Sequence, residues 1–177
     1  MHSEEYYKKL RKKYTPSHCR VIFLLESPPA SGKYFYDDSG TVNEPLFKKM
    51  MKCFIPFNPV TKKNGLKEFS RMGYLVMYAV NKPLNRIKSA KKKREVILDN
   101  LGGLEKDLKS IVKRRAVKII IVGSELREIL EAKLKENFYV VNDGENVSFE
   151  NEIGENSFSE KIRFLFNIHN INLEMYC

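Results

Sequence analysis

The stretch "RVIFLLE" at residues 20–26 decides the fold. It is a continuous run of apolar and β-branched residues with no polar alternation, which is typical of a strand buried on both faces of a parallel sheet. Two runs of the same kind follow, "YLVMYAV" at 74–80 and "AVKIIIVG" at 116–123, and a shorter one, "FYVV", lies at 138–141. We therefore predict four buried strands.

Helical patterns separate these runs. In "EPLFKKMMKCF" the apolar residues recur at helical spacing behind a proline in the first turn. Strands that alternate with helices predict an α/β protein, here a three-layer α/β/α sandwich with a mainly parallel four-stranded sheet. We expect one domain over residues 1–177, with Ser124 as N-cap of one helix and Ser157 or Ser159 as N-cap of the last. The predicted helices cover residues 3–12, 44–54, 64–73, 92–115 (with "NLGGLEKDL" as its weak point), 124–134 and 157–168.

The charge balance indicates a polyanionic partner. The chain carries a formal net charge of +10, and its lysines and arginines occur in runs. One explanation is an ordinary solvated surface; the other is nucleic acid, because cations that neutralise phosphates release condensed counterions. We favour the second, with DNA as the partner of a monomeric protein. The predicted contact residues are Arg86, Lys88, Lys91, Lys92, Lys93, Arg94, Lys113, Arg114 and Arg115.

Cysteine and histidine are scarce. The three cysteines are odd in number and far apart, which favours a reducing, cytoplasmic setting and excludes a metal knuckle by spacing. With only three histidines as well, we predict no metal site and no cofactor. No apolar run approaches the roughly 18 residues of a membrane span, so we expect no membrane partner.

The loop after the first predicted strand contains the best candidates for catalytic and ligand-binding residues. Glu26 ends that strand, at the edge where α/β sheets bind ligands, and two prolines and three aromatic residues follow in "SPPASGKYFY". A carboxylate beside an aromatic face suits a planar base with charge developing next to it. In the alternative interpretation, Glu26 caps a neighbouring helix and the rings belong to the core.

The order of these pieces resembles the uracil-DNA glycosylase superfamily, and most closely its thermostable iron–sulfur branch. "ESPPASGKYFYDDSG…LFKKMM" is similar to the branch's first motif, in which Gly-Glu-Ala-Pro-Gly precedes a Gly-x-Pro-Phe-Val-Gly segment. "GYLVMYAVNKPLNR" is similar to the second strand and its loop, and "LEKDLKSIVKRRAVKIIIVGSELREIL" to the following helix, strand and helix. The resemblance covers residues 20 to about 135 and implies the strand order 2-1-3-4.

The resemblance also implies roles for individual residues. Glu26 falls on the acid that positions or activates the attacking water, and Phe35 on the ring that stacks on the flipped base. N-glycosidic cleavage passes through an oxocarbenium-like sugar, which a nearby carboxylate stabilises. The residues expected around the base are Ser27, Phe35, Tyr36, Met77 and Asn81.

The sequence differs from the family pattern at several positions that bind the base or a cluster. The base-reading Asn of the family aligns with Met77, which cannot hydrogen-bond a uracil edge, and Asn81 falls on a cluster-ligating Cys. The chain has no Cys-x-x-Cys, and residues 142–156 contain no counterpart of the family's His-Pro-Ser loop. We therefore expect no iron–sulfur cluster and predict a divergent DNA glycosylase of base-excision repair, acting on another damaged base. The alternatives are a catalytically inactive nucleic-acid-binding protein and a small-molecule enzyme or interaction module.

Overall fold

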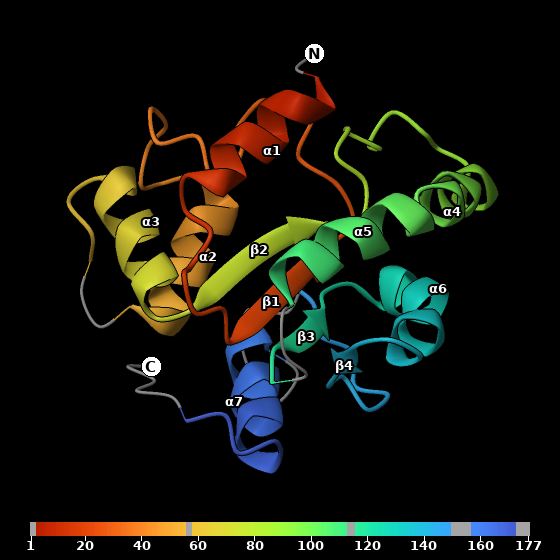
Figure 1. Ribbon diagram of the computed structural model, residues 1–177. Coiled ribbons are helices and arrows are strands. Elements are labelled where there is room, and N and C mark those ends of the chain that lie inside the picture. The colour runs from red at the N-terminus through yellow and green to blue at the C-terminus, as the bar shows by residue number, and fades with distance from the viewer. Residues whose placement is uncertain (1–2, 56–57, 113–115, 150–156, 173–177) are drawn as a thin grey trace.

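The four apolar runs form one parallel sheet at the centre of the molecule (Figure 1). The computed structural model describes residues 3–55, 58–112, 116–149 and 157–172. The spatial order of the strands is β2-β1-β3-β4, and every neighbouring pair is parallel. This confirms the predicted α/β/α architecture and the order 2-1-3-4. The strands are β1 (Val21–Leu25), β2 (Tyr74–Tyr78), β3 (Lys118–Ile121) and β4 (Tyr139–Val140).

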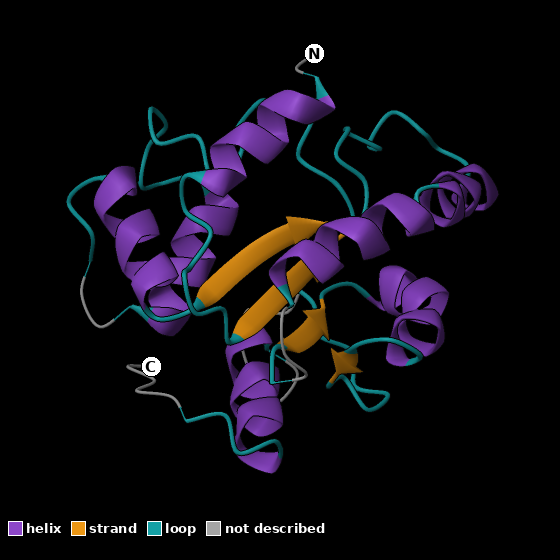
Figure 2. Ribbon diagram, in the orientation of Figure 1, coloured by secondary structure: helices purple, strands orange, loops and turns teal. Residues whose placement is uncertain are grey.

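Helices connect the strands and cover both faces of the sheet (Figure 2). On one face, aromatic residues of α2, α3 and α7 pack against Phe23 of β1 and Tyr74 of β2. Helix α5 crosses in front of the sheet in Figure 1 and covers the opposite face. The helices are α1 (Glu4–Lys12), α2 (Pro45–Phe54), α3 (Lys62–Arg71), α4 (Ala90–Asp99), α5 (Leu101–Ile111), α6 (Ser124–Lys135) and α7 (Phe158–Ile168).

Two helix boundaries differ from the prediction. The segment predicted as one helix over 92–115 forms two helices within its described part, and they meet at Asn100; residues 113–115 lie outside the described residues. The Nδ2 of Asn100 donates a hydrogen bond to the Ala79 carbonyl at 2.6 Å. The N-cap of α6 is Gly123 rather than Ser124, so the prediction for Ser124 was wrong. Gly123 has φ 109°, a backbone conformation that favours glycine, and no side chain caps this helix. Of the two candidates for α7, Ser157 is the cap, because its hydroxyl accepts from the Glu160 N–H at 3.3 Å.

The Tyr36 hydroxyl forms hydrogen bonds with backbone groups at the outer edge of the sheet. Strand β2 lies at the edge, so the N–H and C=O groups on its outer side have no partner strand. The Tyr36 hydroxyl accepts from the Val76 N–H at 2.7 Å and donates to the Val76 carbonyl at 3.1 Å. One phenol therefore replaces a missing strand at this position.

Asn142 plays a comparable role after β4. Its side chain is fully buried; Oδ1 accepts from the Ile121 N–H at 2.7 Å, and Nδ2 donates to the Ile121 carbonyl at 2.9 Å. Nδ2 also lies 3.2 Å from the carbonyl of Glu145, and Val147 then forms a parallel bridge with Val122. The loop after β4 thereby extends the sheet beside β3.

Candidate functional site at the carboxyl edge of the sheet

Glu26 lies immediately after β1, at the carboxyl edge of the sheet. Its carbonyl accepts a hydrogen bond from the Val80 N–H at 3.0 Å, so pairing with the β2 segment continues through this residue. The side chain is 29% exposed, which leaves the carboxylate accessible to solvent. Among the described helices, no backbone N–H donates to this carboxylate. The structure therefore does not use Glu26 as a helix cap.

Lys93 is the charged partner of Glu26. Its Nζ lies 3.5 Å from Glu26 Oε1, and the lysine side chain is 27% exposed. Lys93 belongs to the first turns of α4. Ser89 is the N-cap of this helix, and its hydroxyl accepts from the Lys92 N–H at 3.3 Å. The acid at the end of β1 and the cationic start of α4 therefore meet at one place.

Further exposed cations lie on the loop before α4 and on α4 itself. The loop after β2 and helix α4 lie beyond the arrowhead of β2 in Figure 1. Their basic side chains project from a short segment of the chain and, apart from Lys93, are all exposed. Of the cations predicted to contact nucleic acid, Arg86, Lys88, Lys91, Lys92 and Arg94 are exposed here, together with Lys82, while Lys113, Arg114 and Arg115 lie outside the described residues.

Ser27 links the two loops at this edge, and Asn81 contacts helix α1. The Ser27 hydroxyl accepts from the Leu84 N–H at 3.3 Å, which links the loop after β1 to the loop after β2. Asn81 is 6% exposed, and its Nδ2 lies 3.5 Å from Glu4 Oε1. Its Oδ1 has no hydrogen-bond partner among the described residues. Asn81 thus presents an unused acceptor in the polar edge behind Glu26.

The remaining residues predicted to contact a base are buried. Phe35 and Tyr36 are each 1% exposed and Met77 is inaccessible. The Phe35 ring lies 5.5 Å from that of Phe69, which packs against Tyr74 of β2. Because side chains alternate along a strand, Met77 points to the opposite face. Phe35 and Met77 are therefore not brought together, and the aromatic residues form core as in the alternative interpretation.

A small hollow nevertheless reaches the loop that contains Phe35. It has a volume of about 300 Å³, and its walls are mostly apolar. The loop after Glu26 contributes Pro29, Ser31 and Lys33, and α2 contributes Leu46 and Phe47. Phe35 forms part of its wall.

The aromatic loop is anchored by an ion pair that the sequence analysis missed. Lys62 Nζ lies 2.6 Å from Glu44 Oε2 and 2.7 Å from the carbonyl oxygen of Tyr34. In the sequence, Lys62 stands in the polar segment "TKKNG", where nothing distinguishes it from a surface lysine. Only the packing of α3 against α2 brings its ammonium into the core.

Comparisons with protein-family models, with curated proteins and with solved structures found no match. Within the described residues, no cluster of three or more His, Cys, Asp or Glu side chains is placed to hold a metal ion. In the same residues, no helix is both long and apolar enough to cross a membrane.

Proposed function

We propose that this protein binds nucleic acid along the carboxyl edge of its sheet. The observation that carries the proposal is the Glu26–Lys93 pair at 3.5 Å, which joins an accessible acid to a run of exposed cations. The cations of α4 and of the loop before it supply phosphate contacts, which give affinity without sequence preference. DNA is the partner that the resemblance to the glycosylase superfamily favours.

The position of Glu26 favours a second step, hydrolysis of the N-glycosidic bond of a damaged base. In this proposal the carboxylate orients water and stabilises the positive charge that develops on the sugar. Lys93 would hold the carboxylate in place while phosphates approach. The parallel sheet with order β2-β1-β3-β4 supports this chemistry, since it is the arrangement that the resemblance implies. Phe35 would stack on the extruded base only after the 26–33 loop moves.

The burial of Phe35, Tyr36 and Met77 favours the binding function without catalysis. The two functions predict different responses to the same substitution. Glu26→Gln keeps the shape of the side chain and removes its charge, so a glycosylase should lose a factor of about 10² to 10³ in excision rate. A binding protein has no turnover to lose, and its affinity should change little.

The test uses duplex and single-stranded oligonucleotides that carry different lesions, with strand cleavage after alkali as the readout of excision. Binding is measured in parallel by fluorescence anisotropy. Glu128→Gln, an exposed acid on α6, is the matched control. Excision by wild type that is lost in Glu26→Gln supports the glycosylase; salt-sensitive binding with no excision supports the binding protein. Absence of binding at low salt overturns both.

A further inference from the structure

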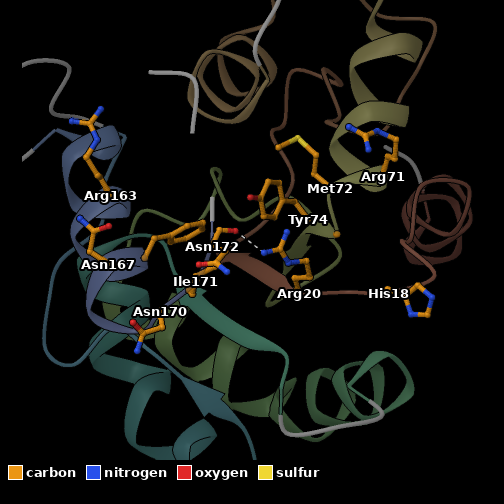
Figure 3. A pocket seen from close by; sticks show the side chains of 12 residues that line it. His18, Arg20, Arg71, Met72, Tyr74, Arg163, Asn167, Asn170, Ile171 and Asn172 are labelled. Carbon is orange, nitrogen blue, oxygen red and sulfur yellow. Dashed lines mark hydrogen bonds between the residues drawn. The ribbon is translucent and has the colours of Figure 1, made fainter. Parts of the chain in front are cut away.

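The amino edge of the sheet, opposite Glu26, carries a larger hollow of about 820 Å³ (Figure 3). Its walls come from the residues just before β1 and β2 and from the end of α7 and the segment after it. Small-molecule sites in proteins commonly have volumes of roughly 300–1,000 Å³. The hollow therefore has the size of a site for a nucleotide-like molecule.

The lining is cationic. Arg20, Arg71 and Arg163 contribute guanidinium groups, and no Asp or Glu is among the lining residues. Figure 3 shows Arg71 and Arg163 on opposite sides of the view with Arg20 between them. Arg71 and Arg163 form ion pairs with Glu68 and Glu160 of their own helices.

Of the three lining arginines, Arg20 has no carboxylate partner among the described residues. Its Nη2 donates to the carbonyl of Asn172 at 2.6 Å, and among the described residues it contacts no acid. Its side chain lies across Gly73, which has φ 84°; a Cβ there would come within 2.7 Å of Arg20 Cγ. Glycine at this position thus permits the placement of Arg20, whose guanidinium retains unused N–H donors toward the hollow.

Tyr74 adds an unused donor to the floor of the hollow. The residue is inaccessible to solvent, and its hydroxyl has no hydrogen-bond partner among the described residues. Burial raises the pKa of Tyr74 to about 12, and the nearby Arg20 opposes this rise, so the phenol carries its proton at neutral pH. A buried hydroxyl without a partner is uncommon in proteins and points to a missing acceptor.

The other walls suit the organic part of such a ligand. Asn167, Asn170 and Asn172 supply amides that can both donate and accept hydrogen bonds. Met72, which is partly exposed, supplies apolar surface beside them, against which a planar ring can pack. Arginine is the side chain best matched to phosphate, because its fork of N–H groups makes two parallel hydrogen bonds.

We propose that this hollow binds a phosphate monoester of nucleotide size, with Arg20 and Tyr74 donating to the phosphate and Arg163 adding to the positive field. The asparagines and Met72 contact the organic part. This site is separate from the one proposed at the carboxyl edge and does not depend on it.

Isothermal titration calorimetry with adenosine monophosphate, ribose 5-phosphate and inorganic phosphate as probes tests the proposal. We expect the nucleotide to bind most tightly, Arg20→Gln to weaken it about tenfold to hundredfold and Tyr74→Phe about threefold to tenfold. Lys133→Gln, an exposed lysine on α6, is the control and should leave binding unchanged. Circular dichroism checks that each variant is folded. If Arg20→Gln does not fold, Arg163→Gln takes its place as the test variant.

Three outcomes would overturn the proposal. The first is no binding of any probe by the wild-type protein at millimolar concentration. The second is equal loss in Lys133→Gln and Arg20→Gln, which would indicate nonspecific attraction of anions. The third is binding of an oligonucleotide, but of none of the small probes, that is lost in Arg20→Gln. In that case the hollow would be part of a nucleic-acid surface.

Discussion

Lys62 Nζ lies 2.6 Å from Glu44 Oε2, and the two side chains are only 0% and 9% exposed. The same ammonium donates to the Tyr34 carbonyl at 2.7 Å, and the other oxygen of Glu44 accepts from the Thr41 N–H at 3.0 Å. The pair therefore joins α3, the start of α2 and the aromatic loop. Because both charges are desolvated, the removal of one leaves the other without compensation.

Lys62→Met should reduce the free energy of unfolding by about 3–5 kcal/mol, since Glu44 becomes a buried charge without a partner. Urea denaturation followed by circular dichroism measures this change. Lys63→Met is the matched control, because Lys63 is exposed, and it should change stability by about 0.5 kcal/mol or less. A loss below about 1 kcal/mol in Lys62→Met would show that the pair contributes little to stability.

Tyr36→Phe should destabilise the fold by about 1–3 kcal/mol, because the Val76 N–H and C=O groups at the edge of β2 lose their partner. The ring itself stays, so its packing is not disturbed. Thermal unfolding compared with Tyr139→Phe, an exposed tyrosine on β4, isolates the effect of the buried hydroxyl. Equal stability of the two variants would mean that water replaces the phenol at the edge of the sheet.

Asp38 should make stability depend on pH in the acid range. The hydrogen bond from the Tyr14 hydroxyl, at 2.6 Å, lowers the pKa of Asp38, and the ammonium of Lys13 acts in the same direction. A carboxyl whose pKa is lower in the folded state stabilises the fold above its unfolded pKa of about 4. This contribution is lost as the pH falls through the folded pKa.

The measurement is the free energy of unfolding of wild type and Asp38→Asn between about pH 3 and pH 7. The difference between the two proteins should be largest near neutrality and should shrink on acidification. Asp99→Asn, at an exposed position in α4, is the control and should run parallel to wild type. A difference that grows as the pH falls would contradict the assigned sign.

Asn142→Ala should cost about 1–3 kcal/mol, because Ile121 loses the hydrogen bonds that extend β3 and both of its backbone groups are buried. Hydrogen exchange at the Ile121 amide reports the local effect, which should be faster in the variant. Asn146→Ala changes an exposed asparagine of the same loop and serves as the comparison. Unchanged exchange at Ile121 would assign Asn142 no role in the sheet.

The cations of α4 should set the salt dependence of DNA binding, if the proposed function is correct. Lys91→Gln combined with Lys92→Gln removes two exposed charges and should lower the slope of log K against log salt by about two. Lys133→Gln on α6 is the control and should leave the slope unchanged. Anisotropy titrations from about 50 to 200 mM salt measure it. An equal decrease in the control would point to a diffuse effect of net charge.

The sequence determined the architecture of this protein, because continuous apolar runs and helical periodicity are local patterns. "RVIFLLE" and "YLVMYAV" have no polar face, which predicts strands that are covered by helices on both faces of the sheet. Alternation of strands and helices then limits the connections to parallel crossovers. The same reasoning placed Glu26 at the carboxyl edge of the sheet, where the structure has it.

Tertiary structure alone decided which side chains meet and which are buried. The rings of Phe35 and Tyr36 could equally have faced a ligand or the core. Packing against α2 and α3 put Phe35 in the core, and the hydrogen bonds with Val76 hold Tyr36 there. The partners of Lys62 and Glu26, Glu44 and Lys93, lie 18 and 67 residues away in the chain, and no local pattern records such contacts.

The arginine-lined hollow shows the same division. Arg20 and Arg71 each precede a predicted strand in the sequence, and neighbouring parallel strands bring their amino ends together. That signal could have indicated a shared cationic edge. Helix α7 forms the third side of the hollow. Its position depends on how it packs against the sheet, as the contact of Phe166 with Tyr74 shows. Local patterns thus fix the elements, and the long-range burial of apolar surface decides which of their polar groups converge.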